Sequence, residues 1–99
     1  MKINWTEKAI KSFELNIEWL IKNWTDIEIK NFITQTEQLI DRIKQNPYIY
    51  SQSDKKKSVR KGRVNTIVSM FYIVRPRKKE IDILLFWDNR QNPDNKIIK

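Results

Sequence analysis

The chain has 99 residues, about the size of one compact domain, and we expect a single domain spanning residues 1–99. It contains no cysteine and no histidine, which excludes disulfides and thiolate metal sites, so we expect no metal and no other cofactor. Its 20 Lys and Arg against 12 Asp and Glu give a formal charge of +8, which attracts polyanions and acidic protein segments. No stretch approaches the roughly 20 apolar residues of a membrane span. We therefore expect a cytoplasmic protein that does not bind a membrane.

A short strand and two amphipathic helices are predicted for the first half of the chain. Residues Lys2–Trp5 alternate polar and apolar side chains, which is typical of a strand. Thr6 is a suitable N-cap, and apolar residues at three- and four-residue spacing beyond it predict a helix over residues 7–23. "TDIE" at Thr25–Glu28 has the spacing of a capping box, so a second helix begins at once and ends at "NP", residues 46–47. So short a joint predicts an antiparallel helical hairpin.

In the second half of the chain the hydrophobic period changes to two. A loop rich in Ser, Asp and Lys over residues 48–58 precedes the segments "SVRKGRVN", "TIVSMFYIV" and "IDILLFW", which are rich in β-branched and aromatic residues. "RPRKKE", between the last two, suits a hairpin turn because it carries a proline and a cluster of charges. The order β-α-α-β-β-β predicts an α+β fold with the helical hairpin packed on one face of a small sheet.

The last predicted strand carries apolar side chains on both of its sides. Ile83, Leu85 and Trp87 would lie on one face, and Leu84 and Phe86 on the other. Two helices cover only one face of a small sheet, so the second face is a candidate partner surface. The alternative is that the C-terminal segment of the chain folds over it.

Several stretches, taken in order, resemble the RelE/ParE superfamily of toxins from type II toxin–antitoxin systems: "NWTEKA", two helices, "NPYIYS", "VRKGRV", "MFYIV" and "ILLFWDNRQNP". The resemblance covers nearly the whole chain. It implies a small antiparallel sheet with the helical hairpin on one face, and a toxin that inhibits growth until a small antitoxin, encoded beside it, neutralises it. An acidic antitoxin segment that folds on binding would suit both the charge and the apolar face.

For the antitoxin-binding surface we expect contributions from four strand residues, with ordinary core packing as the alternative for each: Met70, Tyr72, Leu84 and Phe86.

The superfamily contains two mechanisms, and the resemblance implies either. RelE-type members cut messenger RNA in the ribosome, where the RNA's own 2′-hydroxyl attacks and the protein supplies an acid, a base and cations around the phosphate. ParE-type members poison DNA gyrase by binding to it and need no catalytic residues. For an RNA-cutting activity the candidate residues are Arg60, Lys61, Arg63, Arg90 and Lys96.

The match to the RelE-type catalytic residues is partial. Arg90 occupies the position of the last-strand arginine of those enzymes, and Arg60 lies near their basic second-strand residues. Ser69 stands where they carry another arginine, and Lys96 where they carry a C-terminal tyrosine. With two positions unmatched we favour DNA gyrase as the target, with ribosomal cleavage of messenger RNA, using Lys96 or Tyr72 instead, as the alternative.

The sequence leaves three further points open. The +8 charge also suits a plain nucleic-acid-binding module, which is a third functional class. Arg90 is expected to face a target or an antitoxin, with a local pair to Asp88 as the alternative. If the basic strand near Arg60 and the last strand are adjacent, their cations would converge on one end of the sheet as a phosphate clamp.

Overall fold

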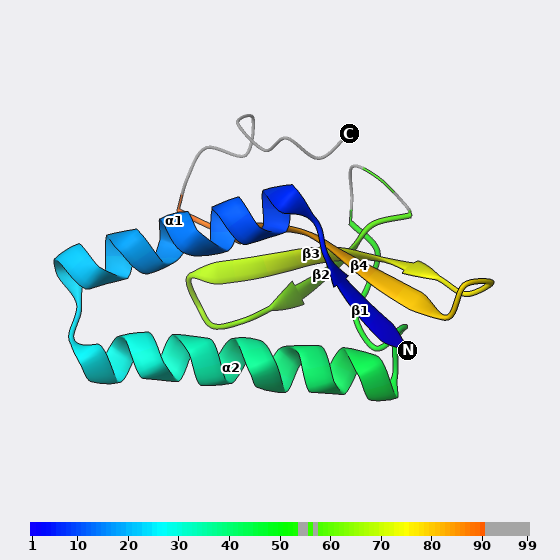
Figure 1. Ribbon diagram of the computed structural model, residues 1–99, viewed down its shortest axis with the longest axis horizontal. Helices are drawn as coiled ribbons and strands as arrows, with labels where there is room; N and C mark the ends of the chain where they lie inside the picture. Colours follow the sequence, from blue (N-terminus) through cyan, green and yellow to red (C-terminus); the bar gives the residue numbers. More distant parts are fainter. Residues whose placement is uncertain (54–55, 57, 91–99) are drawn as a thin grey trace.

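The computed structural model describes residues 1–53, 56 and 58–90. Its elements in chain order are β1 (Lys2–Trp5), α1 (Glu7–Asn23), α2 (Asp26–Gln45), β2 (Arg60–Arg63), β3 (Val68–Arg75) and β4 (Glu80–Asp88). The predicted α+β class and the order β-α-α-β-β-β are confirmed, and Figure 1 shows the two helices running antiparallel. Within the described ranges, no helix is both long enough and apolar enough to cross a bilayer.

Both helices begin at the predicted threonines. The Thr6 hydroxyl accepts a hydrogen bond from the Ala9 N–H at 3.1 Å, and the Thr25 hydroxyl accepts one from the Glu28 N–H at 3.4 Å. The Glu28 carboxylate in turn accepts a hydrogen bond from the Thr25 hydroxyl at 3.2 Å. These side chains satisfy amides that a helix leaves unpaired in its first turn, which is why the start of each helix is readable from sequence.

The four strands form one sheet in the order β1-β4-β3-β2. The pairs β2–β3 and β3–β4 are antiparallel as expected, whereas β1 lies parallel to β4, with Lys2 opposite Glu80 and Trp5 opposite Ile83. The sheet is therefore mixed rather than wholly antiparallel. The physical reason is the connection: both helices and two strands separate β1 from β4, so no hairpin turn forces these two strands to run in opposite directions.

A β-bulge interrupts β4 at Leu84. Phe71 of β3 lies opposite Leu85, but its neighbour Tyr72 lies opposite Ile83, so Leu84 has no partner on β3. An extra residue of this kind shifts the alternation of side chains by one position.

The bulge changes which residues of β4 share a face. Ile83 and Phe86 both face the helices, whereas Leu85 and Trp87 lie on the opposite face, which we call the far face. The predictions that Ile83 shares a face with Leu85 and Trp87, and that Leu84 shares a face with Phe86, are both wrong, because they assumed an unbroken period of two.

Two apolar clusters result, one on each face of the sheet. The larger cluster joins the helices to the sheet and includes Ala9, Leu20, Phe32, Leu39, Ile43, Met70, Tyr72, Ile81, Ile83 and Phe86. The far face carries Val59, Phe71, Leu85 and Trp87, and none of these is more than 8% exposed. The second apolar face predicted from the sequence therefore exists, and its central side chains are buried in the structure.

Ser12 attaches α1 to the edge of β4. β1 ends at Trp5, so beyond Ile83 this edge of β4 has no neighbouring strand. The buried Ser12 hydroxyl accepts a hydrogen bond from the Phe86 N–H at 2.9 Å and donates one to the Lys8 carbonyl at 2.8 Å. A helix side chain thus replaces the missing strand partner of a buried amide.

We expect Ser12→Ala to lower the free energy of unfolding by about 1–3 kcal/mol, because it leaves the Phe86 N–H buried without an acceptor. Urea unfolding followed by circular dichroism measures this loss. The control is Ser51→Ala, whose exposed side chain should change stability by no more than about 0.5 kcal/mol. Equal stability of the two variants would contradict the role given to Ser12.

Candidate functional site

The alternation of β2 divides its basic residues between the two faces of the sheet. Arg60 lies opposite Tyr72, which packs against the helices, so Arg60 is on the helix side. Its guanidinium donates to the Tyr50 carbonyl at 2.8 Å and lies 4.9 Å from the Tyr48 ring centroid. Arg60 therefore holds the segment after α2 against β2.

Lys61 and Arg63 lie together on the far face. Lys61 is opposite Phe71, with its Nζ atom 5.9 Å from that ring centroid, and Arg63 is opposite Ser69. Both cations are exposed, whereas Ser69 is fully buried and its hydroxyl donates to Asn89 Oδ1 at 3.1 Å. Two residues along a strand span roughly 7 Å, so the far face presents two cations side by side above an apolar floor.

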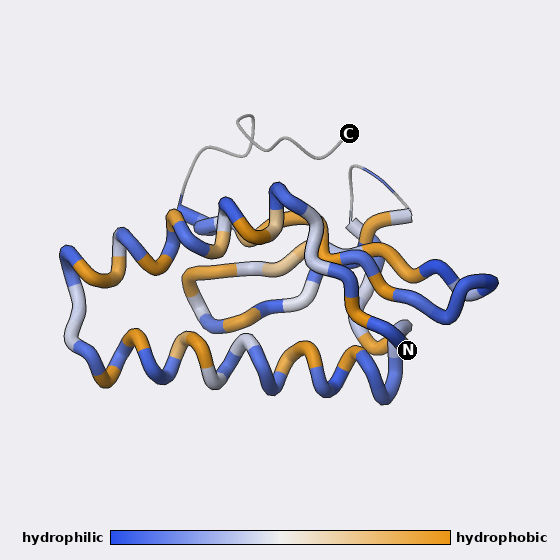
Figure 2. The backbone as a smooth tube through the Cα atoms, viewed as in Figure 1, coloured by the Kyte–Doolittle hydropathy of each residue, from blue (hydrophilic) through white to orange (hydrophobic). Residues whose placement is uncertain are grey.

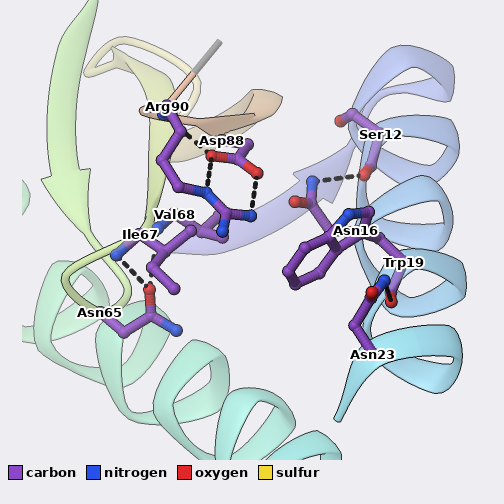
Figure 3. A network of polar contacts seen from close by, with 9 residues as sticks. All are labelled: Ser12, Asn16, Trp19, Asn23, Asn65, Ile67, Val68, Asp88 and Arg90. Atoms are coloured by element: carbon purple, nitrogen blue, oxygen red, sulfur yellow. Dashed lines mark hydrogen bonds and ion pairs between the residues drawn. The ribbon is translucent and has the colours of Figure 1, made fainter.

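Arg90 makes a two-point ion pair with Asp88. Arg90 Nε donates to one carboxylate oxygen at 3.0 Å and Nη2 donates to the other at 2.7 Å. The guanidinium carbon lies 4.4 Å from the Trp19 ring centroid, so Arg90 also connects the end of β4 to α1 (Figure 3). The local pairing with Asp88, the alternative predicted from the sequence, is present in the structure.

The Arg90–Asp88 pair shifts both ionisations. The Arg90 hydrogen bond, opposed by partial burial, lowers the pKa of the Asp88 carboxyl below its usual value. The same hydrogen bond raises the pKa of Arg90. Asp88 is thus an anion at neutral pH that partly neutralises Arg90, while half of the Arg90 side chain stays exposed.

Between α1 and β4 lies a groove formed by two adjoining hollows of about 570 and 710 Å³. Both hollows are lined by Ser12, Leu15, Leu85 and Trp87. The second also reaches Asn16, Trp19 and Arg90, and we call the whole the α1–β4 groove. Leu15 is 64% exposed and Trp19 38% exposed, so apolar surface on α1 remains open to solvent beside a cation.

The candidate RNA-cutting residues do not form one cluster. β3 lies between β2 and β4, so the condition for a single phosphate clamp, adjacency of these strands, is not met. Lys61 and Arg63 lie on the far face, Arg60 on the helix side, and Arg90 against α1. Lys96 lies outside the described residues.

The four residues predicted to bind the antitoxin are mostly inside the protein. Met70, Tyr72 and Phe86 are at most 2% exposed in the core between helices and sheet, and Leu84 is half-buried on the far face. The Tyr72 hydroxyl donates to the Pro47 carbonyl at 2.9 Å. Burial is the main reason that the pKa of Tyr72 rises to about 12, so this phenol stays protonated at neutral pH.

Sequence reasoning missed the contribution of α1 to the groove. Leu15 and Trp19 are four residues apart and therefore share a helix face, which also carries Ser12. This face lies beside the main apolar stripe of the helix. The signal available in the sequence was the apolar pair Leu15 and Trp19 next to the small polar residue Ser12.

In the part of the chain that the structure describes, no group of three potential metal-ligating side chains occurs.

The fold is that of known toxins, although no protein-family model and no curated protein matches the sequence. The chain is similar to the YoeB/ParE toxin from Agrobacterium tumefaciens, with a TM-score of 0.66 and 15% identity over 90% of this chain and 99% of that one. It is also similar to the isolated Escherichia coli RelE toxin, with a TM-score of 0.61 and 13% identity over 94% and 88% of the two chains.

A third similar structure is the YoeB–YefM complex from Staphylococcus aureus, with a TM-score of 0.58 and 15% identity over 87% of this chain and 93% of the matched chain. The resemblance to the RelE/ParE superfamily seen in the sequence is thus confirmed at the level of the fold.

We expect Arg90→Ala to raise the pKa of Asp88 toward the ordinary value of 3.8, which NMR titration of the side-chain carboxyl measures. Because the folded-state pKa is depressed, the pair stabilises the fold above the unfolded-state pKa, and this contribution is lost as pH falls through the folded value. Parent and variant should therefore differ in stability at neutral pH and converge in acid. Asp82, paired with Arg75, is the internal control and should titrate identically in both proteins.

Proposed function

We propose that this chain is the toxin of a type II toxin–antitoxin pair and that it acts by cutting RNA at the far face of its sheet. The fold shared with RelE and YoeB toxins supports the first part. The position of Arg63 directly opposite Ser69 supports the second.

RelE-type enzymes carry an arginine where this chain has Ser69. The absence of that arginine is one of the two mismatches that favour DNA gyrase as the target. Directly opposed residues of antiparallel strands have Cβ atoms about 4.5–5.5 Å apart, so the long Arg63 side chain can reach the space in front of Ser69. A cation from the neighbouring strand thus compensates for the unmatched position, which weakens the case against RNA cleavage.

The far face can serve the charge that develops during RNA cleavage. As the 2′-oxygen bonds to phosphorus and the 5′-oxygen departs, negative charge grows on the phosphate oxygens. Lys61 and Arg63 would stabilise that charge from one side, with Arg63 able to donate two parallel hydrogen bonds. Lys96 remains the proposed proton-transfer residue, because the other substitute, Tyr72, is buried and its pKa is about 12.

We expect Arg63→Ala to slow cleavage of ribosome-bound messenger RNA by about 10²-fold, as loss of a charge-stabilising donor typically does. The assay is primer extension on messages from purified ribosomes incubated with each protein. The control is Lys30→Ala, which removes an exposed cation from α2 and should cut at the parent rate. Equal rates for the two variants would refute the role of Arg63.

Poisoning of DNA gyrase remains the second candidate function, because the burial of Tyr72 removes one of the two proposed substitutes for the missing catalytic tyrosine. A ParE-type toxin needs no such residue. Growth arrest with intact messages and altered plasmid supercoiling would support gyrase and reject RNA cleavage.

For the antitoxin we propose the α1–β4 groove as a binding surface. It offers open apolar side chains on α1, and Arg90 at one end can meet an acidic residue. An amphipathic, acidic segment that folds on binding suits this combination on a chain of charge +8. The similar YoeB–YefM structure, which is a complex, supports the existence of such a partner.

We expect Leu15→Glu to weaken binding of the antitoxin by at least about tenfold, because it places a carboxylate in the apolar part of the groove. The partner to use is the product of the adjacent reading frame, with its affinity measured by isothermal titration calorimetry. Ile27→Glu is the matched control, since Ile27 is similarly exposed at 71% but lies on α2. Unchanged binding by Leu15→Glu would place the antitoxin elsewhere.

A further inference from the structure

The turn between β3 and β4 forms a basic tip at the end of the sheet remote from Arg63. Residues Arg75–Lys79 contain four cations and no acid, and all five are exposed. Figure 1 shows this hairpin projecting past the end of α2, and Figure 2 shows that its end is hydrophilic. We call Arg77, Lys78 and Lys79 the basic tip.

Nearby acidic residues are engaged by other partners and form no ion pair with the basic tip. Asp82 is paired with Arg75 and also accepts a hydrogen bond from Asn4 at 2.9 Å. Glu80 accepts a second hydrogen bond from the same Asn4 amide at 2.7 Å. Among the described residues, no carboxylate is in ion-pair contact with Arg77, Lys78 or Lys79. The Asp82 carboxylate attracts Lys78 only beyond ion-pair distance, so the three exposed cations keep a net positive charge.

Lys79 occupies a backbone conformation that does not suit lysine. Its φ is +55°, in the left-handed region that glycine and asparagine adopt most readily. Its N–H donates to the Pro76 carbonyl at 3.2 Å, which closes the turn. A glycine would serve this geometry better. The presence of a long cation at a strained position therefore points to a role for its charge rather than to a requirement of the turn.

We propose that the basic tip docks on the phosphate backbone of double-helical RNA. A projecting two-stranded ribbon with cations at its end can approach the backbone of a duplex and contact phosphates without reading bases. The basic tip lies roughly 23 Å along the strands from the row of Arg63 and Ser69, so it is a docking contact separate from the cleavage site. The choice of RNA over DNA rests on the proposed function; the phosphate contact itself does not.

An acidic protein segment fits the basic tip less well. Binding of such a segment depends on apolar side chains that enter a groove, as the α1–β4 groove provides. The shallow hollow at the hairpin is lined mainly by charged side chains, with Val74 and Pro76 as its apolar members. Phosphates need only cations at the right spacing, which is what the basic tip presents.

The test measures binding of a fluorescein-labelled RNA duplex by anisotropy across a series of salt concentrations. The tip variant combines Arg77→Gln, Lys78→Gln and Lys79→Gly, the last chosen because glycine relieves the φ of +55°. The matched control combines Arg42→Gln, Lys22→Gln and Lys30→Gln, which also removes one arginine and two exposed lysines but from the helices. A DNA duplex of the same sequence is measured in parallel, and circular dichroism verifies that both variants are folded.

We expect the tip variant to bind the RNA duplex at least about tenfold more weakly than the control variant, with a salt slope shallower by about 2 to 3, one unit for each lost phosphate contact. The single variant Lys79→Gly should unfold at a temperature no lower than the parent yet bind the RNA duplex more weakly, which would not be expected if Lys79 had only a structural role.

Equal losses of RNA affinity in the tip and control variants would show that only total charge matters and would overturn the proposal. Tighter binding of the DNA duplex would overturn the choice of RNA. None of these outcomes depends on cleavage, so failure of the tip and failure of the proposed RNA-cutting activity remain distinguishable.

Discussion

The hydrogen bond between the Ser12 hydroxyl and the Phe86 N–H determines how the two layers of this protein meet. β4 has two different neighbours on one edge: β1 pairs with its first half, and α1 covers its second half. Because a helix rather than a strand lies beside Phe86, one side of α1 faces β4 across a groove instead of a continuous sheet. The open surface of Leu15 and the contact of Arg90 with Trp19 both follow from this arrangement.

The positive charge of the chain is distributed over places with different chemical settings. On the far face, Lys61 and Arg63 stand over apolar side chains, where a phosphate would be partly shielded from water and held more strongly. Beside α1, Arg90 is already paired with Asp88, a setting suited to a protein partner that can replace or extend that pair. At the basic tip the cations are exposed to solvent and stand over no apolar cluster, so their interactions should be the most sensitive to salt.

The elements of this fold could be predicted from sequence because local chemistry marks them. Thr6 and Thr25 cap the helices, Pro47 follows the end of α2, and β3 and β4 are rich in β-branched, aliphatic and aromatic residues. The faces on which the β4 side chains lie could not be predicted from sequence. They depend on the bulge at Leu84, which is set by how β4 pairs with β3 and is not signalled by any residue type. Met70, Tyr72 and Phe86, expected at a partner surface, lie in the core, which is the alternative that the sequence left open for each of them.

The parallel pairing of β1 with β4 has a consequence for synthesis of the chain. β1 cannot pair until β4, more than 70 residues later, has been synthesised. The apolar stripes of α1 and α2 also stay exposed until then, because β3 and β4 supply most of the surface that they cover. At translation rates of about 5–20 residues per second, this interval is roughly 4–16 s. The sheet closes only when its last strand is made, so a ribosome that stalls before β4 leaves an unfolded fragment rather than a smaller working domain.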